Sequence, residues 1–180
     1  MSKIDVSQWK EFKISDLFSV RPSKYIKKNG RAMSNIELLD DGDHPVIVNS
    51  GEHNGIGGYT SQVVTEPGNV ITYSDTVNGN TVFYQAKSFV GYSHVKVMEP
   101  KVNLDSASMI FVTTVIRKCL MDGGYDFVNK MTTNRVLNTI IKLPVDSTGQ
   151  PDWQYMDSYI AKRAALAHKY VSELRLLISM

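Results

Sequence analysis

Five basic residues gather near the start of the chain, and they are the side chains best suited to binding an anion: Arg21, Lys24, Lys27, Lys28 and Arg31. Pro22, Ser23, Asn29 and Gly30 stand between them, and these residue types favour turns. The pattern predicts a surface loop with a positive face, which suits phosphate contact. A loop that is merely solvated is the alternative reading of the same charges.

Residue patterns for catalysis or metal binding are not found. The glycines of residues 51–58 lack a Gly-Lys-Ser/Thr ending, and the four histidines show no His-x-x-x-His spacing. Ser50 and His53 are close in sequence, but no Gly-x-Ser-x-Gly elbow surrounds them. Asp152 follows Pro151 as in some nuclease motifs, yet no acidic-x-Lys pair follows it. We therefore expect a protein that is not an enzyme and holds no metal.

Composition and charge are those of a folded domain with uneven charge along the chain. The 180 residues are 42% hydrophobic and 21% charged, with a net charge of +2. Residues 1–31 carry eight basic and three acidic residues, residues 32–86 carry seven acidic and no basic ones, and residues 87–142 carry eight basic and four acidic ones. No apolar stretch approaches the length of a membrane span, and a single cysteine, Cys119, excludes an internal disulfide. We expect a cytoplasmic protein without a membrane segment.

Short β-rich runs with turn residues between them dominate the first hundred residues. A strand leads into one helical turn over residues 9–20, with Ser15 as the expected N-cap and with Leu17 and Phe18 pointing inward. Further strands are predicted at residues 45–48, 70–73, 81–84 and 94–98. The pattern indicates a β-rich globular domain with a mixed, twisted sheet.

One helix and one further strand are expected before the domain ends. Asn103 or Asp105 is the expected N-cap of a helix that Gly123-Gly124 terminates. Its inward positions fall at helical spacing: Met109, Ile110, Thr113, Ile116 and Leu120. Residues 135–143 are read as a final strand, and the turn-rich stretch 144–151 as a boundary. We place the globular domain at residues 1–150.

A long helix is predicted for residues 151–180, with Asp152 as its N-cap. It contains no Gly or Pro after Pro151 and would be roughly 42 Å long. Its apolar residues are separated by alternating steps of four and three, as in the seam of a coiled coil or an antiparallel helix pair: Ile160, Ala164, Ala167, Val171, Leu174 and Ile178. Leu166, Tyr170 and Leu177 widen the stripe, so a helix packed on its own domain is the alternative. The overall fold class is α+β.

Several phrases follow one another in an order that points to a known family. They are Trp9 with Asp16-Leu-Phe18, Pro45-Val-Ile-Val48 with Asn54-Gly-Ile-Gly-Gly-Tyr59, Pro67-Gly-Asn-Val-Ile-Thr72, Asn78-Gly-Asn-Thr-Val-Phe-Tyr84, and Leu143-Pro-Val145 with Gly149-Gln-Pro-Asp-Trp-Gln-Tyr-Met156. Together they resemble a target recognition domain of type I restriction-modification specificity (S) subunits. The resemblance covers nearly the whole chain, and the last phrase, which runs into the long helix, is the most specific.

The resemblance implies a function in sequence-specific recognition of double-stranded DNA. The usual S subunit has two such domains alternating with two long helices that pair antiparallel, whereas this chain looks like a half-length form with one of each. It would pair with a copy of itself through residues 151–180 as a homodimer and read an interrupted palindrome. The implied partners are methyltransferase subunits, which bind S-adenosylmethionine and modify adenine, and a restriction subunit that uses ATP and Mg. No cofactor is implied for this chain.

Polar residues in turns are the candidates for reading DNA. Lys24, Lys27, Lys28 and Arg31 suit phosphates, while residues in or beside turns that have hydrogen-bonding groups or rings suit base edges: Tyr92, His94, Thr133, Asn134 and Arg135. Asn54, Asn78 and Asn80 belong to the shared phrases, which indicates turn architecture more than base reading. The acidic residues from Glu37 to Asp75 are expected to face away from phosphate.

Two other functions fit the same residues. The chain would be the recognition piece of a restriction enzyme of another type if a neighbouring gene carried fused nuclease and methyltransferase motifs. It would be a protein decoy if it occupied the S position on a methyltransferase without selecting any DNA sequence.

Overall fold

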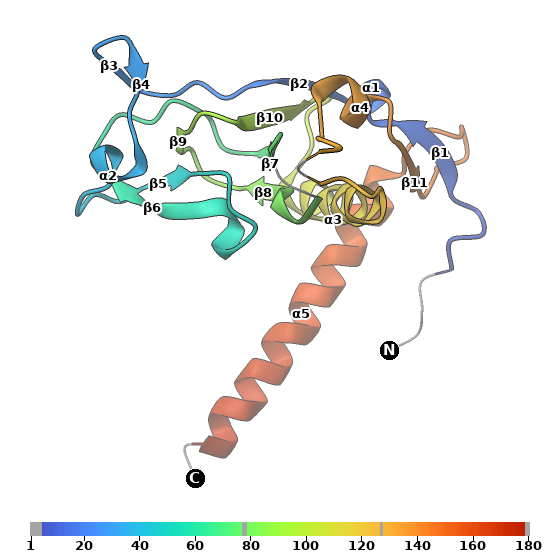
Figure 1. Cartoon of the computed structure of the whole chain (residues 1–180). Coiled ribbons are helices and arrows are strands. Elements are labelled where there is room, and N and C mark those ends of the chain that lie inside the picture. Colours follow the sequence, from blue (N-terminus) through green and yellow to red (C-terminus); the bar gives the residue numbers. More distant parts are fainter. Residues whose placement is uncertain (1–4, 77–78, 127, 179–180) are drawn as a thin grey trace.

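The computed structural model describes residues 5–76, 79–126 and 128–178, and it has an α+β fold with one long C-terminal helix (Figure 1). The strands are β1 (Lys10–Lys13), β2 (Phe18–Pro22), β3 (Lys27–Lys28), β4 (Arg31–Ala32), β5 (His44–Ile47), β6 (Ile56–Thr60), β7 (Val70–Ser74), β8 (Phe83–Gln85), β9 (Val90–Gly91), β10 (Val95–Pro100) and β11 (Ile140–Leu143). The helices are α1 (Ile14–Leu17), α2 (Asn35–Leu38), α3 (Ser106–Asp122), α4 (Thr133–Leu137) and α5 (Trp153–Ile178), with 3-10 turns at His53–Gly55 and Gly79–Thr81.

Two sheets form the body of the domain, and one of them is mixed. An antiparallel sheet has the strand order β2-β10-β7-β8, so its two central strands are shielded by neighbours on both sides. The other has the order β6-β5-β9, in which β5 pairs antiparallel with β6 and parallel with β9. A separate ladder joins β1 near the start of the chain to β11 near its end. This pairing closes the domain just before the long helix begins.

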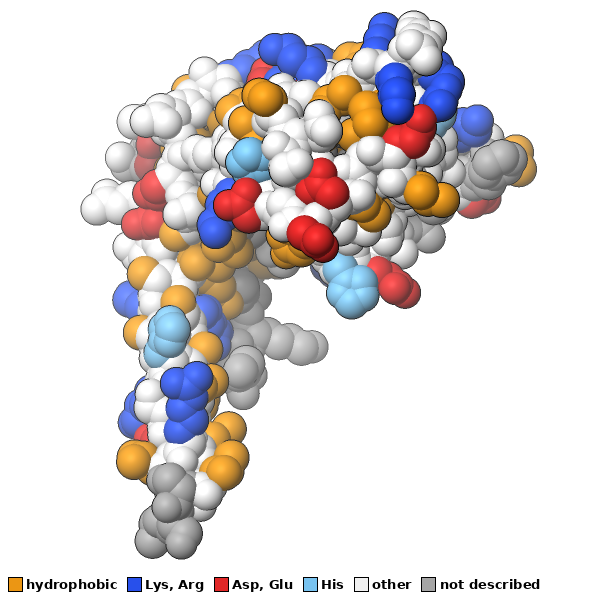
Figure 2. Space-filling view, turned by 90° about the vertical axis from the view of Figure 1, so that its left-hand side faces the viewer, with side chains coloured by type: hydrophobic (Ala, Val, Ile, Leu, Met, Phe, Trp, Pro, Cys, Tyr) orange, Lys and Arg blue, Asp and Glu red, His pale blue; other side chains and the backbone are white. Residues whose placement is uncertain are grey.

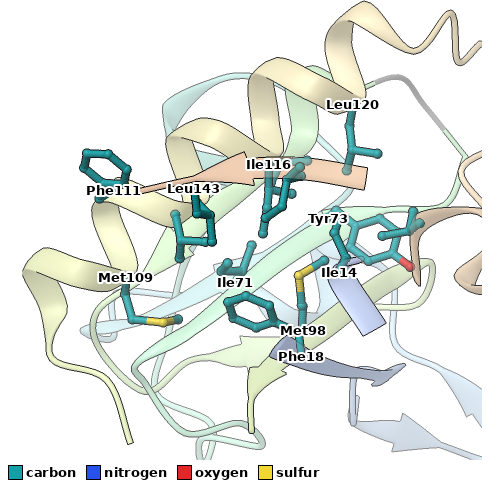
Figure 3. Close-up of a cluster of buried hydrophobic side chains, with 14 of the residues drawn as sticks. Ile14, Phe18, Ile71, Tyr73, Met98, Met109, Phe111, Ile116, Leu120 and Leu143 are labelled. Atoms are coloured by element: carbon teal, nitrogen blue, oxygen red, sulfur yellow. The ribbon is translucent and has the colours of Figure 1, made fainter. Parts of the chain in front are cut away.

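The main core lies between the antiparallel sheet and α3 (Figure 3). Ile71, Tyr73 and Met98 point from the sheet toward Met109, Ile116 and Leu120 of α3, and all six are at most 1% exposed. Ile14 and Phe18, from the first segments of the domain in sequence, and Leu143, from its last strand, belong to the same cluster. Burial of such side chains contributes about 1.5–3 kcal/mol each, so this cluster is the chief source of stability.

The expected helix after residue 105 is confirmed. The Asp105 carboxylate accepts a hydrogen bond from the backbone N–H of Ser108 at 2.9 Å, and the helix ends at Gly123. Met109, Thr113, Ile116 and Leu120 are buried as predicted. The prediction for Ile110 was wrong, because this residue is 41% exposed on the outer side of the helix.

The long C-terminal helix α5 is also confirmed, and only its first two turns contact the domain. The Asp152 carboxylate caps it by accepting a hydrogen bond from the Tyr155 N–H at 2.8 Å. Met156 is fully buried, while Trp153, Tyr159 and Ile160 pack against the main core. From Ala161 to Ile178 every residue is exposed apart from the half-buried Arg163 and Leu166, and Figure 1 shows this part projecting away from the domain.

Three local predictions were wrong. The cap of α1 is at Lys13, whose N–H donates to the Asp16 carboxylate at 3.1 Å, and Ser15 lies inside the turn. The strand expected at residues 135–143 is confirmed only for Ile140–Leu143, which form β11. Residues 135–137 belong to α4 instead, because one helical turn buries Val136 in the core after the N-cap Thr132. The strand expected at residues 81–84 begins at Phe83 and follows a 3-10 turn. Each error falls at a short element whose geometry is set by tertiary contacts.

The predicted division at residue 150 stays a prediction, although the β1–β11 ladder and the anchoring of Met156 describe what lies on either side of it. Within the described ranges, no helix is long and apolar enough to span a membrane.

Candidate nucleic-acid interface

The basic loop of the sequence is a β-hairpin that stands out from the domain. β3 and β4 pair antiparallel, with Lys28 opposite Arg31. Asn29 (φ 52°) and Gly30 (φ 78°) form the two-residue connection, and positive φ at both positions is the backbone of a type I′ turn, which Asn-Gly favours. Figure 1 shows the hairpin at one end of the upper edge of the domain, with α4 near the other end.

A partly buried cluster of one arginine and two carboxylates fixes the base of this hairpin. The Arg21 guanidinium donates to both oxygens of Glu66, at 2.8 and 2.7 Å, and to Glu99 at 2.7 Å. The Glu66 side chain is fully buried, and it also accepts a hydrogen bond from the backbone N–H of Lys24. The hydrogen bonds to Glu66 raise the pKa of Arg21. Arg21 therefore holds the backbone in place. It belongs to the basic residues of this loop, but its charge is already paired with Glu66 and Glu99.

Three lysines of the hairpin region are not neutralised by any carboxylate of the described residues. Among the described residues, no acidic side chain lies within ion-pair distance of Lys24, Lys27 or Lys28, and all three are exposed. Arg31 differs, because its guanidinium donates two hydrogen bonds of 2.8 Å to the Glu37 carboxylate. These bonds, with those from Ser34, lower the pKa of Glu37 to about 2. Of the four predicted phosphate contacts, Arg31 alone is already paired.

The hairpin is joined at its base to the turn that carries Tyr92 and His94. Tyr25 forms a parallel bridge with Gly91, and the Ser23 hydroxyl donates to the Tyr92 carbonyl at 3.0 Å. The Ser23 N–H donates to the carbonyl of Val95 at 2.9 Å. The chain reverses here with His94 at φ 69°, a conformation that is rare for residues other than glycine and is often found at functional sites.

His94 borders a cavity of about 400 Å³. The cavity lies where the ends of β7 and β10 face the segment that leads into α4, and polar side chains line it: Asp75, Thr76, His94, Lys96, Lys130, Thr132 and Thr133. Lys96 donates to the Asp75 carboxylate at 2.9 Å, and His94 Nδ1 lies 3.5 Å from the other oxygen of Asp75. The cavity thus offers hydrogen-bonding groups of both kinds, donors and acceptors, which is what recognition of a base edge requires.

The structure brings together only some of the five predicted base-reading residues. His94 and Thr133 line the same cavity, although they are far apart in sequence. Tyr92 is half-buried and packs with the second sheet. Arg135 donates to Asn129 and to the carbonyl of Lys130, and the Asn134 side chain accepts from Asn138 at 3.1 Å. Arg135 therefore also holds the loop before α4, and Asn134 contacts the residue that follows this helix.

Several lining residues were not predicted from the sequence. Lys96 alternates with the buried Val95 and Val97, so its outward position was readable, but its neighbours across the cavity were not. Asp75, Lys130 and Thr132 reach the cavity through strand pairing and through the path of the chain before α4. Only the tertiary fold brings these segments together.

The structure shows what one asparagine of the shared phrases does. Asn54, at φ 58°, donates its side-chain N–H to the carbonyl of Tyr84 at 3.2 Å and to Gln85 at 3.3 Å. Gln85 in turn donates to the carbonyl of Asn54 at 3.0 Å. This is the turn architecture that we expected. Asn78 lies outside the described residues.

Acidic and basic residues occupy different stretches of the sequence, but some of them are neighbours in the structure. Glu37 pairs with Arg31, Glu66 with Arg21 and Asp75 with Lys96, so acidic residues of the 37–75 stretch adjoin the basic hairpin and the cavity. On the face shown in Figure 2, Lys and Arg side chains gather along the upper edge, with acidic side chains below them.

The helix seam is exposed beyond the domain. Ile160 is half-buried against the main core, and Ala164 and Ala167 are exposed. Val171, Leu174 and Ile178 are 47%, 57% and 86% exposed. Figure 2 shows hydrophobic side chains along the projecting helix, interspersed with basic ones and a histidine. Within one chain, the seam has an apolar surface that the domain does not cover.

Comparison with known proteins places these features in a family. Residues 6–175 match the model of the type I restriction modification DNA specificity domain. The specificity subunit S.BcgI of a type II restriction enzyme from Heyndrickxia coagulans is 28% identical over 159 residues, which cover 86% of this chain and 43% of that protein.

Two solved structures have the same fold at low sequence identity. The S subunit of a type I restriction-modification system from M. genitalium superposes with a TM-score of 0.59 at 15% identity, covering 95% of this chain and 44% of that one. The HsdS subunit from Thermoanaerobacter tengcongensis gives 0.54 at 10% identity, covering 97% and 41%. The chain thus spans less than half the length of the relatives it matches.

Proposed function

The chain belongs to the type I restriction modification DNA specificity domain family, and we propose that it is a DNA-recognition subunit that selects the sequence on which partner subunits act. The observation that carries the proposal is the positive hairpin, which is joined through Ser23 to the turn that holds His94 at a polar cavity. Free lysines and base-reading groups thus lie on one continuous framework.

The two parts of the interface would have different roles. Lys24, Lys27 and Lys28 have no acidic partner among the described residues, so each would bind a backbone phosphate and release counterions from DNA. These contacts fix the register of the domain on the duplex without reading sequence. His94 and Thr133 at the cavity would then contact base edges.

The ion pairs at the base of the hairpin support this division of roles. Arg21 is bound on both sides by Glu66 and Glu99, and Glu66 also holds the backbone at Lys24. The hairpin base is therefore positioned before DNA arrives. Preorganised contacts lose less conformational entropy on binding than mobile ones do.

A homodimer is the second part of the proposal. The matched relatives are more than twice as long as this chain, and the chain has one domain and one long helix. Two copies paired through α5 would supply two recognition domains, and two-fold symmetry would require both to select the same bases. The DNA site would be an interrupted palindrome.

Catalysis would belong to the partners. We propose that methyltransferase subunits dock on the chain, bring S-adenosylmethionine and modify adenine, and that a restriction subunit brings ATP and Mg. The chain itself would act in the cytoplasm, contribute sequence choice and assembly, and bind no cofactor. S.BcgI is named as the specificity subunit of a type II enzyme, and this similarity favours a second candidate, the recognition piece of a restriction enzyme of another type.

The test is selection from random duplex DNA with the purified chain, with and without a cognate methyltransferase, at near-physiological salt so that phosphate binding does not mask specificity. Enrichment of a defined motif supports the proposal. Copurification with the methyltransferase but no enrichment in either condition would overturn it and favour the decoy.

A further inference from the structure

Asp75 and His94 meet at two points, where β7 has just ended and β10 is about to begin. The backbone N–H of Asp75 donates to the carbonyl of His94 at 3.2 Å, and Oδ1 of the Asp75 carboxylate lies 3.5 Å from Nδ1 of the His94 ring. The pair continues the antiparallel register of the two strands, in which Ser74 lies opposite Val95. The sheet therefore fixes the carboxylate beside the ring.

The two oxygens of this carboxylate have different surroundings. Oδ2 lies 2.9 Å from the Lys96 ammonium, whereas Oδ1 is buried and has no hydrogen-bond partner among the described residues. A buried acceptor without a donor costs free energy. The His94 ring supplies the donor if its Nδ1 carries the proton, because a small turn of the ring shortens the separation of 3.5 Å to hydrogen-bond length.

A proton on Nδ1 determines what the other nitrogen of the ring can bind. In a neutral imidazole one nitrogen donates and the other accepts, so Nε2 would be an acceptor. The His94 side chain is 61% exposed and borders the polar cavity, and its Nε2 has no hydrogen bond among the described residues. In the major groove, an acceptor is matched by the exocyclic amino group of adenine or cytosine.

The backbone at His94 indicates a role beyond folding. Its φ of 69° lies in the left-handed region, which is unfavourable for most residues with a side chain. A ring that is 61% exposed buries little apolar surface in return. Backbone strain of this kind is often found where it directs a side chain to a functional site, and here the ring borders the cavity.

We infer that Asp75 is a positioning residue that keeps the proton on Nδ1 of His94, so that Nε2 accepts a hydrogen bond from a base amino group, N6 of adenine or N4 of cytosine. The inference rests on the proposed function, since it names the base edge that the cavity reads. Lys96 completes the arrangement, because it pairs with Oδ2 and leaves Oδ1 for the ring.

The substitution Asp75→Asn tests the inference, because it should move the proton to the other nitrogen of the ring. The Lys96 ammonium can only donate, so it keeps the amide oxygen on its own side and turns the amide N–H₂ toward Nδ1 of His94. Nδ1 then accepts, and Nε2 carries the proton. As a donor, Nε2 suits O6 of guanine or O4 of thymine. Exchanging one oxygen for N–H₂ should therefore change which base is selected.

The first measurement is the ¹⁵N NMR spectrum of the His94 ring in the purified chain without DNA. The pH is set about two units above the usual histidine pKa of about 6.5, so that the ring is neutral. We expect the proton on Nδ1 in the parent chain and on Nε2 in Asp75→Asn. His94→Gly identifies the signal by its loss, and circular dichroism checks that each variant is folded. A proton on Nε2 in the parent, or on Nδ1 in Asp75→Asn, overturns the positioning role.

The second measurement is selection from random duplex DNA at the same pH, with and without a cognate methyltransferase. One motif position should favour adenine or cytosine by about fivefold or more in the parent chain and guanine or thymine in Asp75→Asn. His94→Gly, in which glycine keeps the left-handed backbone, should lose the preference at that position. The base enriched by the parent identifies the amino group. The matched control Asp43→Asn removes a carboxylate 3.7 Å from another histidine, His44, and should leave the motif unchanged.

The outcomes separate this inference from the proposed function. A motif that Asp75→Asn selects unchanged, or with that position merely relaxed, overturns the inference and leaves the proposed function intact. The same holds if His94→Gly selects the parent motif at every position. Absence of any motif from the parent chain overturns the proposed function and the base reading together, whichever nitrogen carries the proton.

Discussion

The globular domain and the projecting part of α5 use apolar side chains in opposite ways. Met156, in the first turn of the helix, is fully buried in the main core, whereas Ile178, near its end, is 86% exposed. Leu120 and Leu174 show the same contrast at 0% and 57% exposure. The main core is buried by the side chains of the domain itself, and the outer helix leaves apolar side chains exposed. The difference teaches that the apolar side chains that stabilise the domain and those that stay exposed lie in separate segments of the chain.

The largest expected effect appears when a leucine is replaced by alanine in the domain core and in the projecting helix. Leu120→Ala removes a fully buried side chain and should lower the free energy of unfolding by about 2–5 kcal/mol. Leu174→Ala, which leaves the domain core untouched, should change it by less than about 0.5 kcal/mol when the domain is monitored at low protein concentration. Urea unfolding measures both. Equal losses in the two variants would contradict the contrast.

The second effect concerns assembly. Val171→Asp with Leu174→Asp places carboxylates in the seam and should yield a folded monomer that no longer reads a bipartite site. Sedimentation equilibrium gives the mass, and circular dichroism confirms the fold. Lys162→Asp with Lys169→Asp, on the opposite side of the helix, is the control and should stay dimeric. An unchanged mass for the seam variant would contradict dimerisation through the seam.

The third effect compares lysines by their position. Replacing Lys24, Lys27 and Lys28 with Ala should weaken DNA binding and reduce the slope of log K against log salt by about 2.7, since each phosphate contact contributes about 0.9. The same replacement at Lys87, Lys118 and Lys162 should leave the slope nearly unchanged. Fluorescence anisotropy across a salt series measures it. If both triple variants lost the same slope, binding would not depend on the hairpin.

A smaller effect should appear at Arg31. Glu37→Gln removes the carboxylate that holds the guanidinium, and the freed Arg31 should gain a phosphate contact. The salt slope should then steepen by about 0.9. Glu52→Gln, another exposed carboxylate of the acidic stretch, serves as the control. A weaker slope in Glu37→Gln would mean that the ion pair is needed to shape the hairpin.

The smallest effect is the pH dependence of the same ion pair. Glu37 has a pKa of about 2 in the folded chain against a usual value of 4.5. Because the folded pKa is the lower one, the contribution to stability is present above pH 4.5 and is lost as the pH falls toward 2. NMR titration of the Glu37 side chain, with the Arg31 guanidinium as reporter, measures it. A midpoint near 4.5 would show that the pair does not persist in solution.

The sequence predicted best where a pattern is long or turn chemistry is strong. The long helix α5, the Asp105 and Asp152 caps and the positive surface loop around Asn29 and Gly30 were all readable, because each depends on residues close together in sequence. That this loop is a β-hairpin came from the structure. The turn of α1 and the helix α4 were not readable, since their short segments follow tertiary packing of Ile14 and Val136.

The candidate interface was predicted only in part. The free lysines and His94 follow from local turns, but the cavity that joins His94 to Thr133 depends on where β10 meets the segment before α4. A count of charges does not predict that Arg31 pairs with Glu37 or that Arg21 pairs with Glu66, because the fold decides which carboxylate each guanidinium meets.

The central claim is that one chain reads half a site and that α5 joins two such halves. The most direct measurement is DNA selection carried out in parallel on the chain and on the Val171→Asp/Leu174→Asp variant. We predict an interrupted palindrome for the chain and a single half of the same motif, more weakly enriched, for the variant. The same bipartite motif from both proteins, or no motif from either, would contradict the claim.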